Sequence, residues 1–193
     1  VGIVCEDKRQ GQRDLLRSKI KRFRRNSGIV GVVSFLLQLP YLFLREKRAL
    51  RRQRRAWWRK SPPEFPGSVP INFVKDLNAL DSLEILTELK ADLFFVFGTR
   101  ILKPYTFQCA QLGAINLHAG ITPEYRGSKS EFWALYNSEP DMVGITLHKV
   151  DKGIDTGGVL LQRRITVNPY DDDIDLRIRN LEAATSAFDD VVE

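Results

Sequence analysis

Length and composition limit what the chain can be. Its 193 residues, 43% of them hydrophobic, are enough for one domain with a sizeable core and leave little room for a second. The two histidines and two cysteines form no cluster with metal-ligand spacing, so we expect no metal site. Cys5 and Cys109 lie in or beside apolar segments and are expected to be buried free thiols of a cytoplasmic protein.

The formal net charge of +6 comes from one part of the chain. Residues 8–60 contain 18 of the 30 lysines and arginines and only 2 of the 24 acidic residues, so the rest of the chain is acidic. Two basic runs, residues 19–25 and 45–60, flank the uncharged apolar segment 26–44. We therefore expect residues 8–60 to form a basic and apolar helical excursion from the domain.

Three partners suit residues 8–60: a membrane surface, the sheet of the domain itself, and RNA. The apolar segment 26–44 approaches the length of a bilayer span, but Pro40 interrupts it, and a crossing would separate the parts of one sheet. Peripheral membrane contact through residues 19–60 and packing of a helix on the sheet are the alternatives, so a membrane-peripheral location stays open. RNA is a third partner, because Arg51–Arg59 with its two tryptophans can meet a phosphate backbone and stack a base.

The apolar patterns predict alternating strands and helices. The chain opens with a strand at Val1–Cys5, and because no methionine precedes it and the last helix has no end, we expect a fragment truncated at both ends. After the excursion and a proline-rich return at residues 61–70, the predicted elements are strand 69–74, helix 81–90, strand 92–97, strand 114–118, helix 130–137, strand 143–150, strand 159–167 and helix 171–193. The strand-helix-strand unit at residues 69–97 favours parallel pairing, so we predict an α/β fold, a three-layer domain with an open, mostly parallel sheet.

The strand at Ala114–His118 carries the first candidate site residues. Side chains two positions apart on a strand point to the same face, so Asn116 and His118 lie side by side. The strand then leads into a loop that contains Gly120 and the stretch Tyr125-Arg126-Gly127. The carboxyl end of such a strand is where open α/β sheets bind ligands.

The glycine-rich loop at Asp151–Gly158 supplies an acid. It contains two carboxylates, Asp151 and Asp155, and the glycine-rich turn after Asp151 favours a capping role for that residue. An amide, an imidazole and a carboxylate suit acyl transfer, because Asn116 and His118 can hydrogen-bond a developing oxyanion while the carboxylate holds the imidazole protonated or relays protons. The sequence shows no Ser or Cys in a nucleophile elbow, which favours direct attack by a substrate amine.

Other side chains near these motifs are harder to assign. His148 shares a strand face with the expected pocket and is equally consistent with a structural histidine. Arg126 can bind an anionic substrate group or brace its own tight loop. Phe132, Trp133 and Tyr136 lie together on the following helix, and this pattern predicts packing in the core.

Motifs between Val69 and Val167 carry a resemblance to a known family. They are Asn116-x-His118, Pro123-x-Tyr125-Arg126-Gly127, Gly144-Ile145-Thr146 and Gly153-Ile154-Asp155-Thr156-Gly157, in this order. Together they resemble the formyltransferase family that uses 10-formyltetrahydrofolate, whose members formylate glycinamide ribonucleotide, methionyl-tRNA or sugar amines. The resemblance implies a single Rossmann-like catalytic domain over residues 1–193, with the excursion at 8–60, and implies that an earlier strand of the sheet is missing from this sequence.

The resemblance also implies roles for single residues. Asn116, His118 and Asp155 would be the catalytic trio of a formyl transfer to a primary amine. The co-substrate would be 10-formyltetrahydrofolate, with no metal, held largely through backbone groups and apolar walls. The residues expected to hold it are Phe97, Gly98, Thr99, Arg100, Ile101, Leu102, Gly153 and Ile154.

The acceptor amine stays open. Residues Ala119–Thr122 read Ala-Gly-Ile-Thr, where methionyl-tRNA and ribonucleotide enzymes of this family commonly carry Ser-Leu-Leu. This difference favours a small amine, such as an amino sugar, over tRNA. Two further alternatives are a 10-formyltetrahydrofolate hydrolase, which would use the same trio with water as acceptor, and a non-catalytic membrane- or RNA-binding module.

Overall fold

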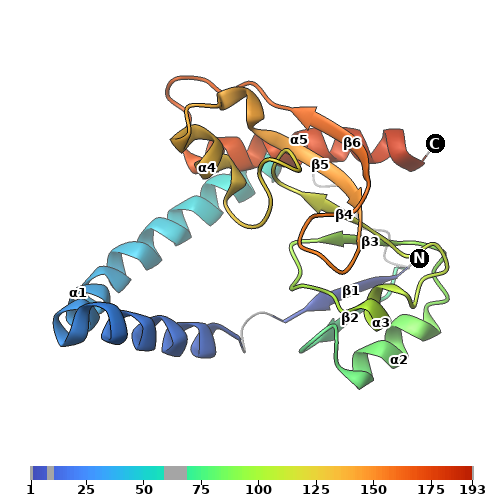
Figure 1. Ribbon diagram of the computed structural model, residues 1–193, viewed down its shortest axis with the longest axis horizontal. Helices are drawn as coiled ribbons and strands as arrows, with labels where there is room; N and C mark the ends of the chain where they lie inside the picture. The colour runs from blue at the N-terminus through green and yellow to red at the C-terminus, as the bar shows by residue number, and fades with distance from the viewer. Residues whose placement is uncertain (1, 8–10, 59–68, 193) are drawn as a thin grey trace.

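The computed structural model describes residues 2–7, 11–58 and 69–192 (Figure 1). Its elements are β1 (Ile3–Glu6), α1 (Gly11–Trp58), β2 (Ile71–Val74), α2 (Leu80–Glu88), β3 (Phe94–Phe97), α3 (Pro104–Phe107), β4 (Ala114–His118), α4 (Ser130–Tyr136), the 3-10 helix η1 (Pro140–Met142), β5 (Gly144–Lys149), β6 (Val159–Arg164) and α5 (Asp173–Val192). Every helix and strand predicted from the sequence is present, with ends that differ by three residues at most, whereas α3 and η1 were not predicted. The proline-rich return at residues 61–70 lies almost entirely outside the described residues.

The strands form two sheets. β1 pairs with β2 in parallel, and the other four described strands form a sheet of order β3-β4-β5-β6. β3 and β4 are parallel, whereas β5 runs antiparallel to both β4 and β6. β5 and β6 are antiparallel because the connection between them is too short to cross over to a parallel strand. The predicted α/β class is confirmed, but the described strands form mixed and not mostly parallel pairings, because β1–β2 and β3–β4 are parallel whereas β4–β5 and β5–β6 are antiparallel.

Helices cover both faces of the four-stranded sheet. On one face, apolar side chains of β4 and β5 pack against α5, and the buried residues there are Ile115, Ile145, Leu147, Ala184 and Ala187. On the other face, Val96 and Ala114 pack with Phe107 of α3. Because side chains alternate along a strand, Asn116 and His118 lie on the face of β4 that carries Ala114.

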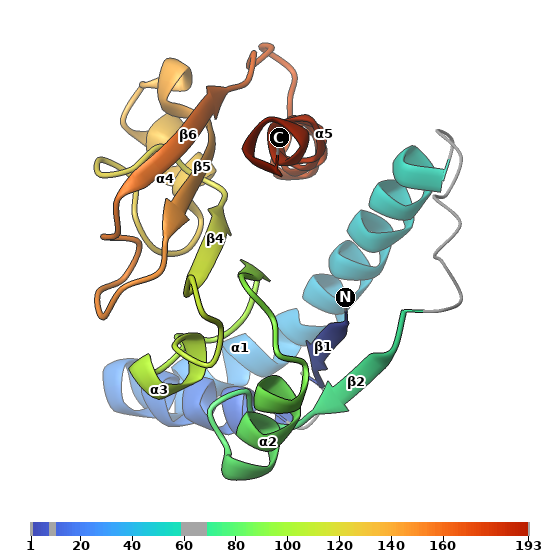
Figure 2. The ribbon, with the colours of Figure 1, turned by 90° about the vertical axis from the view of Figure 1, so that its right-hand side faces the viewer.

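The long helix α1 leaves this domain and returns to it. It bends at Gly28, whose φ of 59° and ψ of −154° lie outside the helical region and would strain a residue with a side chain, so α1 consists of two arms (Figures 1 and 2). The second arm returns to α5, where Arg45 and Arg52 form ion pairs with acidic residues at the start of that helix. Among the described side chains of α1, Phe35 alone is buried. The predicted helical excursion is present, and it contacts α5.

Candidate active site

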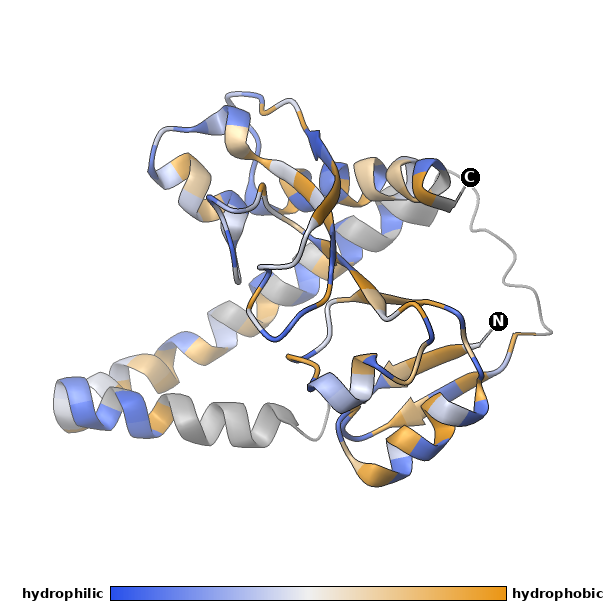
Figure 3. Cartoon of the chain, turned by 45° about the vertical axis from the view of Figure 1, so that its right-hand side comes forward, coloured by the Kyte–Doolittle hydropathy of each residue, from blue (hydrophilic) through white to orange (hydrophobic). Residues whose placement is uncertain are grey.

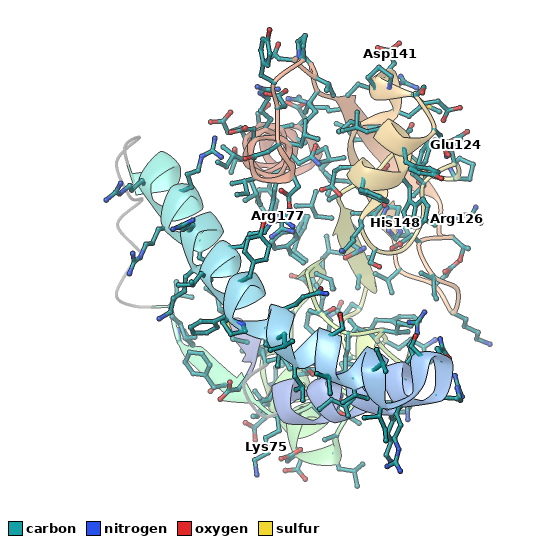
Figure 4. All side chains as sticks on the ribbon, turned by 90° about the vertical axis from the view of Figure 1, so that its left-hand side faces the viewer. Lys75, Glu124, Arg126, Asp141, His148 and Arg177 are labelled. Atoms are coloured by element: carbon teal, nitrogen blue, oxygen red, sulfur yellow. The ribbon has the colours of Figure 1, made fainter. Side chains whose placement is uncertain are left out.

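Strand β4 and its antiparallel neighbour β5 bring polar side chains to one face of the sheet. Asn116 lies opposite His148 in the register of the two strands, and His118 lies opposite Thr146. Directly opposed residues point to the same face, so β5 adds His148 to the pair on β4 (Figure 4). His118 and His148 are 7% and 3% exposed, and both line one cleft. The structure therefore places His148 in the pocket, where the sequence left two alternatives.

The carboxylate of Asp155 lies at the centre of this group. Its Oδ1 atom lies 3.3 Å from Nδ2 of Asn116 and 3.3 Å from Nε2 of His148, and its Oδ2 atom lies 3.4 Å from Nδ1 of His118. The backbone N–H of Gly127 donates to Oδ2 over 2.8 Å. Asp155 has a left-handed backbone with φ of 51°, which costs about 1 kcal/mol and is offset by these hydrogen bonds. The three predicted catalytic residues thus converge.

The hydrogen bonds of His148 determine its tautomer. Its Nδ1 lies 2.8 Å from the backbone oxygen of Lys149, which only accepts, so Nδ1 carries the proton. In the neutral imidazole, Nε2 accepts from Nδ2 of Asn116 over 3.2 Å, and in the protonated form it can instead donate to Oδ1 of Asp155 over 3.3 Å. The second N–H of the same amide donates to Asp155. His148 therefore fixes the direction in which the Asn116 amide points.

His118 is held by a different set of contacts. Its Nε2 donates to the backbone oxygen of Tyr125 over 2.8 Å, which leaves Nδ1 facing Oδ2 of Asp155. In a neutral imidazole that Nδ1 is an acceptor, as is an ionised carboxylate, so the contact is favourable only when the pair holds one further proton. A Cβ at Gly120 would come within 2.6 Å of Nε2, which explains the small residue there. His118 and Asp155 together place an imidazole and a carboxylate beside the Asn116 amide, the two kinds of group that serve as general acids and bases.

The loop after β4 orients both members of this pair through its backbone. The carbonyl of Tyr125 accepts from His118, and the amide of Gly127 donates to Asp155. Tyr125 is buried, and its hydroxyl donates to Glu139. That hydrogen bond raises the pKa of the Tyr125 hydroxyl above its ordinary value. The Tyr-Arg-Gly motif therefore positions the histidine and the carboxylate.

Asp151 caps the glycine-rich loop, as predicted. Its Oδ1 accepts from the backbone N–H of Gly153 over 3.0 Å and from the hydroxyl of Thr156 over 2.6 Å. The hydrogen bond from Thr156 holds the pKa of Asp151 below its ordinary value. These contacts close the loop on itself and hold the turn from which Asp155 reaches β4.

All eleven residues predicted for catalysis and donor binding line the same cleft, which has a volume of about 1440 Å³. The segment Phe97–Leu102, which begins at the last residue of β3, contributes exposed apolar side chains at Phe97 and Ile101. Gly153 and the exposed Ile154 come from the loop that carries the acid. Exposed apolar side chains beside buried polar groups are typical of a small-molecule site.

Arg100 is a predicted donor-binding residue with a structural contact. Its guanidinium pairs with Glu6 of β1 and, over 2.7 Å, with Asp76 after β2. The Glu6 side chain is 5% exposed, whereas that of Arg100 is 44% exposed, so the carboxylate of the pair is shielded from solvent and the guanidinium is not. Arg100 therefore braces the segment after β3 against the two-stranded sheet while it lines the cleft.

The aromatic side chains of α4 were wrongly expected in the core. Phe132, Trp133 and Tyr136 are each at least 50% exposed. The helix has only seven residues, and it turns its small residues Ser130 and Ala134 inward instead. Phe132 and Tyr136 stack with their ring centroids 6.0 Å apart, and both line the cleft. The small residues Ser130 and Ala134, four positions apart in a short helix, were the sequence signal that could have predicted which face of α4 is buried.

Three arginines near the site differ in where they point. Arg177 extends from α5 into the cleft region, and Arg45 of α1 also lines the cleft (Figure 4). Both were missed, because their placement depends on tertiary packing, that of α5 on the sheet for Arg177 and the return of α1 to α5 for Arg45. Arg126 is exposed and does not line the cleft, which favours its interpretation as a loop residue.

The remaining sequence expectations concern metals and thiols. Residues 2–7, 11–58 and 69–192 contain no group of three His, Cys, Asp or Glu side chains able to hold a metal ion. Cys5 and Cys109 are free thiols, as predicted, but both are only partly buried. The Sγ of Cys109 donates to the backbone oxygen of Tyr105 over 3.2 Å.

Comparisons with known proteins agree on one family and fold. The family model described as formyl transferase matches residues 62–192, after α1. The methionyl-tRNA formyltransferase of Chlorobium chlorochromatii is 34% identical over 112 residues, which are 58% of this chain and 35% of that protein. The chain thus spans about a third of that relative's length.

Two solved structures show the same fold. Phosphoribosylglycinamide formyltransferase from Streptococcus pneumoniae matches with a TM-score of 0.55 and 26% identity, over 65% of this chain and 73% of that one. The formyltransferase PseJ from Anoxybacillus kamchatkensis, in complex with UDP-4,6-dideoxy-4-formamido-L-AltNAc and tetrahydrofolate, matches with a TM-score of 0.52 and 25% identity, over 62% and 61% of the two chains. The Rossmann-like fold implied by the resemblance is confirmed.

Proposed function

Since the chain belongs to the formyl transferase family, we propose that its cleft transfers a formyl group from 10-formyltetrahydrofolate to a primary amine. The observation that carries the proposal is the contact of Asp155 with both Asn116 and His118 inside one cleft. The tetrahydrofolate bound to PseJ supports the choice of donor. The treatment of residues 1–193 as one catalytic domain with an excursion at 8–60 is part of this proposal.

Asn116 is placed to stabilise negative charge on the formyl oxygen. When the amine nitrogen bonds to the formyl carbon, the carbonyl oxygen gains charge and needs a preorganised hydrogen-bond donor. The Nδ2 group of Asn116 has two hydrogens, and contacts with His148 and Asp155 set their directions. When a substrate oxygen binds at Nδ2, it replaces His148 or Asp155 as the acceptor of one of these two hydrogen bonds.

The pair of His118 and Asp155 manages the protons of the reaction. The amine loses one proton as its bond to the formyl carbon forms, and the folate nitrogen gains one as its bond to that carbon breaks, so atoms and charge balance. Nδ1 of His118 and Oδ2 of Asp155, 3.4 Å apart, are placed to accept the proton from the amine and to return it to the folate nitrogen. Water as the acceptor would use the same residues, and release of formate in the absence of an amine would identify that hydrolase activity.

We place the donor against Phe97–Leu102, with Gly153 and Ile154. Titration calorimetry with 5-formyltetrahydrofolate, an unreactive stand-in, should show saturable binding that Ile101→Asp weakens at least roughly tenfold, because a charge replaces apolar contact. Leu112→Asp is the matched control, since Leu112 is also an exposed apolar residue but lies outside the cleft. Absence of binding, or equal weakening by both substitutions, would contradict the donor site.

For the acceptor we propose a small amine on an anionic, ring-bearing molecule such as an amino-sugar nucleotide. The stacked rings of Phe132 and Tyr136 offer a flat apolar surface, and the guanidinium of Arg177 offers a partner for phosphate. Arg45 lines the same cleft while it pairs with Asp173 over 3.3 Å. The UDP-linked formamido sugar in the PseJ structure supports this class.

Methionyl-tRNA is the second candidate acceptor, favoured by the 34% identity to a methionyl-tRNA formyltransferase. Mass spectrometry of formylated products from amino-sugar nucleotides, glycinamide ribonucleotide and methionyl-tRNA would distinguish the two. We expect product from the amino-sugar nucleotides, with a KM that Arg177→Gln raises and donor binding that it leaves unchanged. Preferential formylation of methionyl-tRNA would overturn our choice and leave the donor proposal intact.

A further inference from the structure

Helix α1 exposes apolar side chains along most of the segment between Gly28 and Arg45. The exposed ones are Ile29, Val30, Val33, Leu36, Leu37, Tyr41, Phe43 and Leu44. The stretch Arg24–Arg52 has 29 residues, and its most apolar window has a mean hydropathy of 1.8 with only 6% of its residues buried. Figure 3 shows apolar colour along the second arm of α1, most of which stands away from the sheets before the arm reaches α5. A helix in water normally buries its apolar stripe, so this surface fits a partner.

The apolar surface covers more than one side of the helix. Ile29, Val33 and Leu37 follow each other at four-residue spacing and form one row. Leu36 and Phe43 are seven residues apart and form another row, about 100° around the helix from Leu37. A protein groove that covers one row would leave the other in water, whereas the interfacial region of a bilayer can surround both.

Exposed basic side chains border the apolar segment at both ends. They are Lys21, Arg22, Arg24 and Arg25 before it, and Lys47, Arg48, Arg51 and Arg55 after it, whereas Arg45 and Arg52 pair with acidic residues at the start of α5. Residues 26–44 themselves contain no charge. Anionic lipid headgroups complement such clusters, whereas a second copy of the chain would bring like charges together. RNA would complement the clusters but leave the apolar segment exposed.

The topology of the chain excludes a single crossing of the membrane. β1 precedes α1 and β2 follows it, and these strands pair from Ile3 and Ile71 to Glu6 and Val74. One crossing would put the paired strands on opposite sides of the bilayer. The helix must therefore approach and leave the membrane on the same side, which the bend at Gly28 permits.

From these observations we propose that residues 21–55 of α1 dock on the surface of an anionic lipid bilayer. The apolar side chains between Ile29 and Leu44 lie in the interfacial region, and the basic clusters contact the headgroups. Arg45 ends the apolar segment and also lines the cleft, so docking brings the cleft next to the membrane surface. The proposal is independent of the reaction that the cleft catalyses.

Flotation of the protein with vesicles tests this docking without any assay of activity. Vesicles of phosphatidylcholine with one third phosphatidylglycerol should retain the protein, pure phosphatidylcholine should retain much less, and added salt should weaken binding. Leu37→Glu should weaken partition at least roughly tenfold, because it puts a charge into the apolar row. Arg24→Gln should weaken it roughly fivefold at low salt.

The control is Leu112→Glu. Leu112 is 75% exposed and Leu37 is 76% exposed, but Leu112 lies in the folded domain, so its substitution should leave vesicle binding unchanged. Circular dichroism checks that both variants are folded. Failure of the protein to bind anionic vesicles, or equal binding by the wild type and Leu37→Glu, would overturn the proposal. Binding of single-stranded RNA without vesicle binding, or self-association that Leu37→Glu abolishes without vesicle binding, would also overturn it.

Discussion

Two regions of the molecule reverse the usual distribution of polarity. Around Asp155, two histidines are buried, whereas along α1 apolar side chains such as Leu37 face the solvent. Both arrangements oppose the preference of polar groups for water and of apolar groups for the interior. The buried polar group is stabilised inside the chain, and the exposed apolar group requires a partner outside it.

The hydrogen bonds show this difference directly. Each polar side chain around Asp155 contacts another polar group, so the desolvation cost of the group is largely offset. Among the described residues, the buried side-chain atoms without a partner are Thr122 Oγ1 and Asn180 Oδ1, both outside this group. Substitutions in the buried group should therefore change catalysis, and substitutions in α1 should change association.

The largest effect is expected from His118→Ala. It removes the nitrogen that faces Oδ2 of Asp155, so kcat should fall by about 10²–10⁴-fold, the usual contribution of a positioned acid or base. Steady-state kinetics with a formylatable amine would measure this, and titration with 5-formyltetrahydrofolate would check that the donor still binds. Turnover equal to that of the wild type would remove His118 from the mechanism.

A smaller effect is expected from His148→Leu. His148 is a positioning residue in this account, because it directs the Asn116 amide through its Nε2. Its loss should lower kcat by up to about 10²-fold while KM for the donor changes little. A rise in KM with unchanged kcat would instead indicate that His148 contacts a substrate. His148→Gln, which can still accept from Asn116, should recover part of the rate.

Thr156→Val tests the loop that presents Asp155. The hydrogen bond from the Thr156 hydroxyl lowers the pKa of Asp151 below its ordinary value of 3.8. Ionised Asp151 therefore stabilises the folded state at pH values above 3.8, and this stabilisation is lost as the pH falls through the lowered pKa. The melting temperature of the variant should be about 2 °C lower than that of the wild type at pH 7, and this difference should shrink as the pH falls below 3.8. A difference that does not depend on pH would assign the effect to packing.

Leu37→Glu should have the smallest effect on the isolated protein. An exposed side chain makes few contacts, so the free energy of unfolding should change by no more than about 0.5 kcal/mol. Chemical denaturation without lipid would measure it. A large loss of stability would show that Leu37 packs inside the protein in solution, and the contrast between the two regions would fail.

The convergence of Asn116, His118 and Asp155 was easier to predict from the sequence than the surroundings of these three residues. Asn116 and His118 could be paired because strand side chains alternate, and Asp155 was added through the family resemblance. The role of His148 depends on the register between β4 and β5, which no local pattern records. Its place beside Asn116 therefore required the structure.

The packing of the helices also depends on tertiary structure that local sequence patterns do not predict. The pattern of α4 predicts burial of its aromatic residues, but with only seven residues the helix buries Ser130 and Ala134 and leaves the rings to the cleft. Composition identified the basic and apolar parts of α1 but not whether other elements cover the helix. That depends on the bend at Gly28 and on the ion pairs with α5, which are tertiary features.

The most direct test of the central claim is amine-dependent conversion of 10-formyltetrahydrofolate to tetrahydrofolate by the protein and by its Asp155→Asn variant, with Asp141→Asn as the control. Asp141 is an exposed acid on η1 that does not line the cleft. We predict turnover by the wild type and by Asp141→Asn, and a loss of about 10²–10⁴-fold in Asp155→Asn. Equal turnover by all three, or no turnover by the wild type with any amine, would contradict the account.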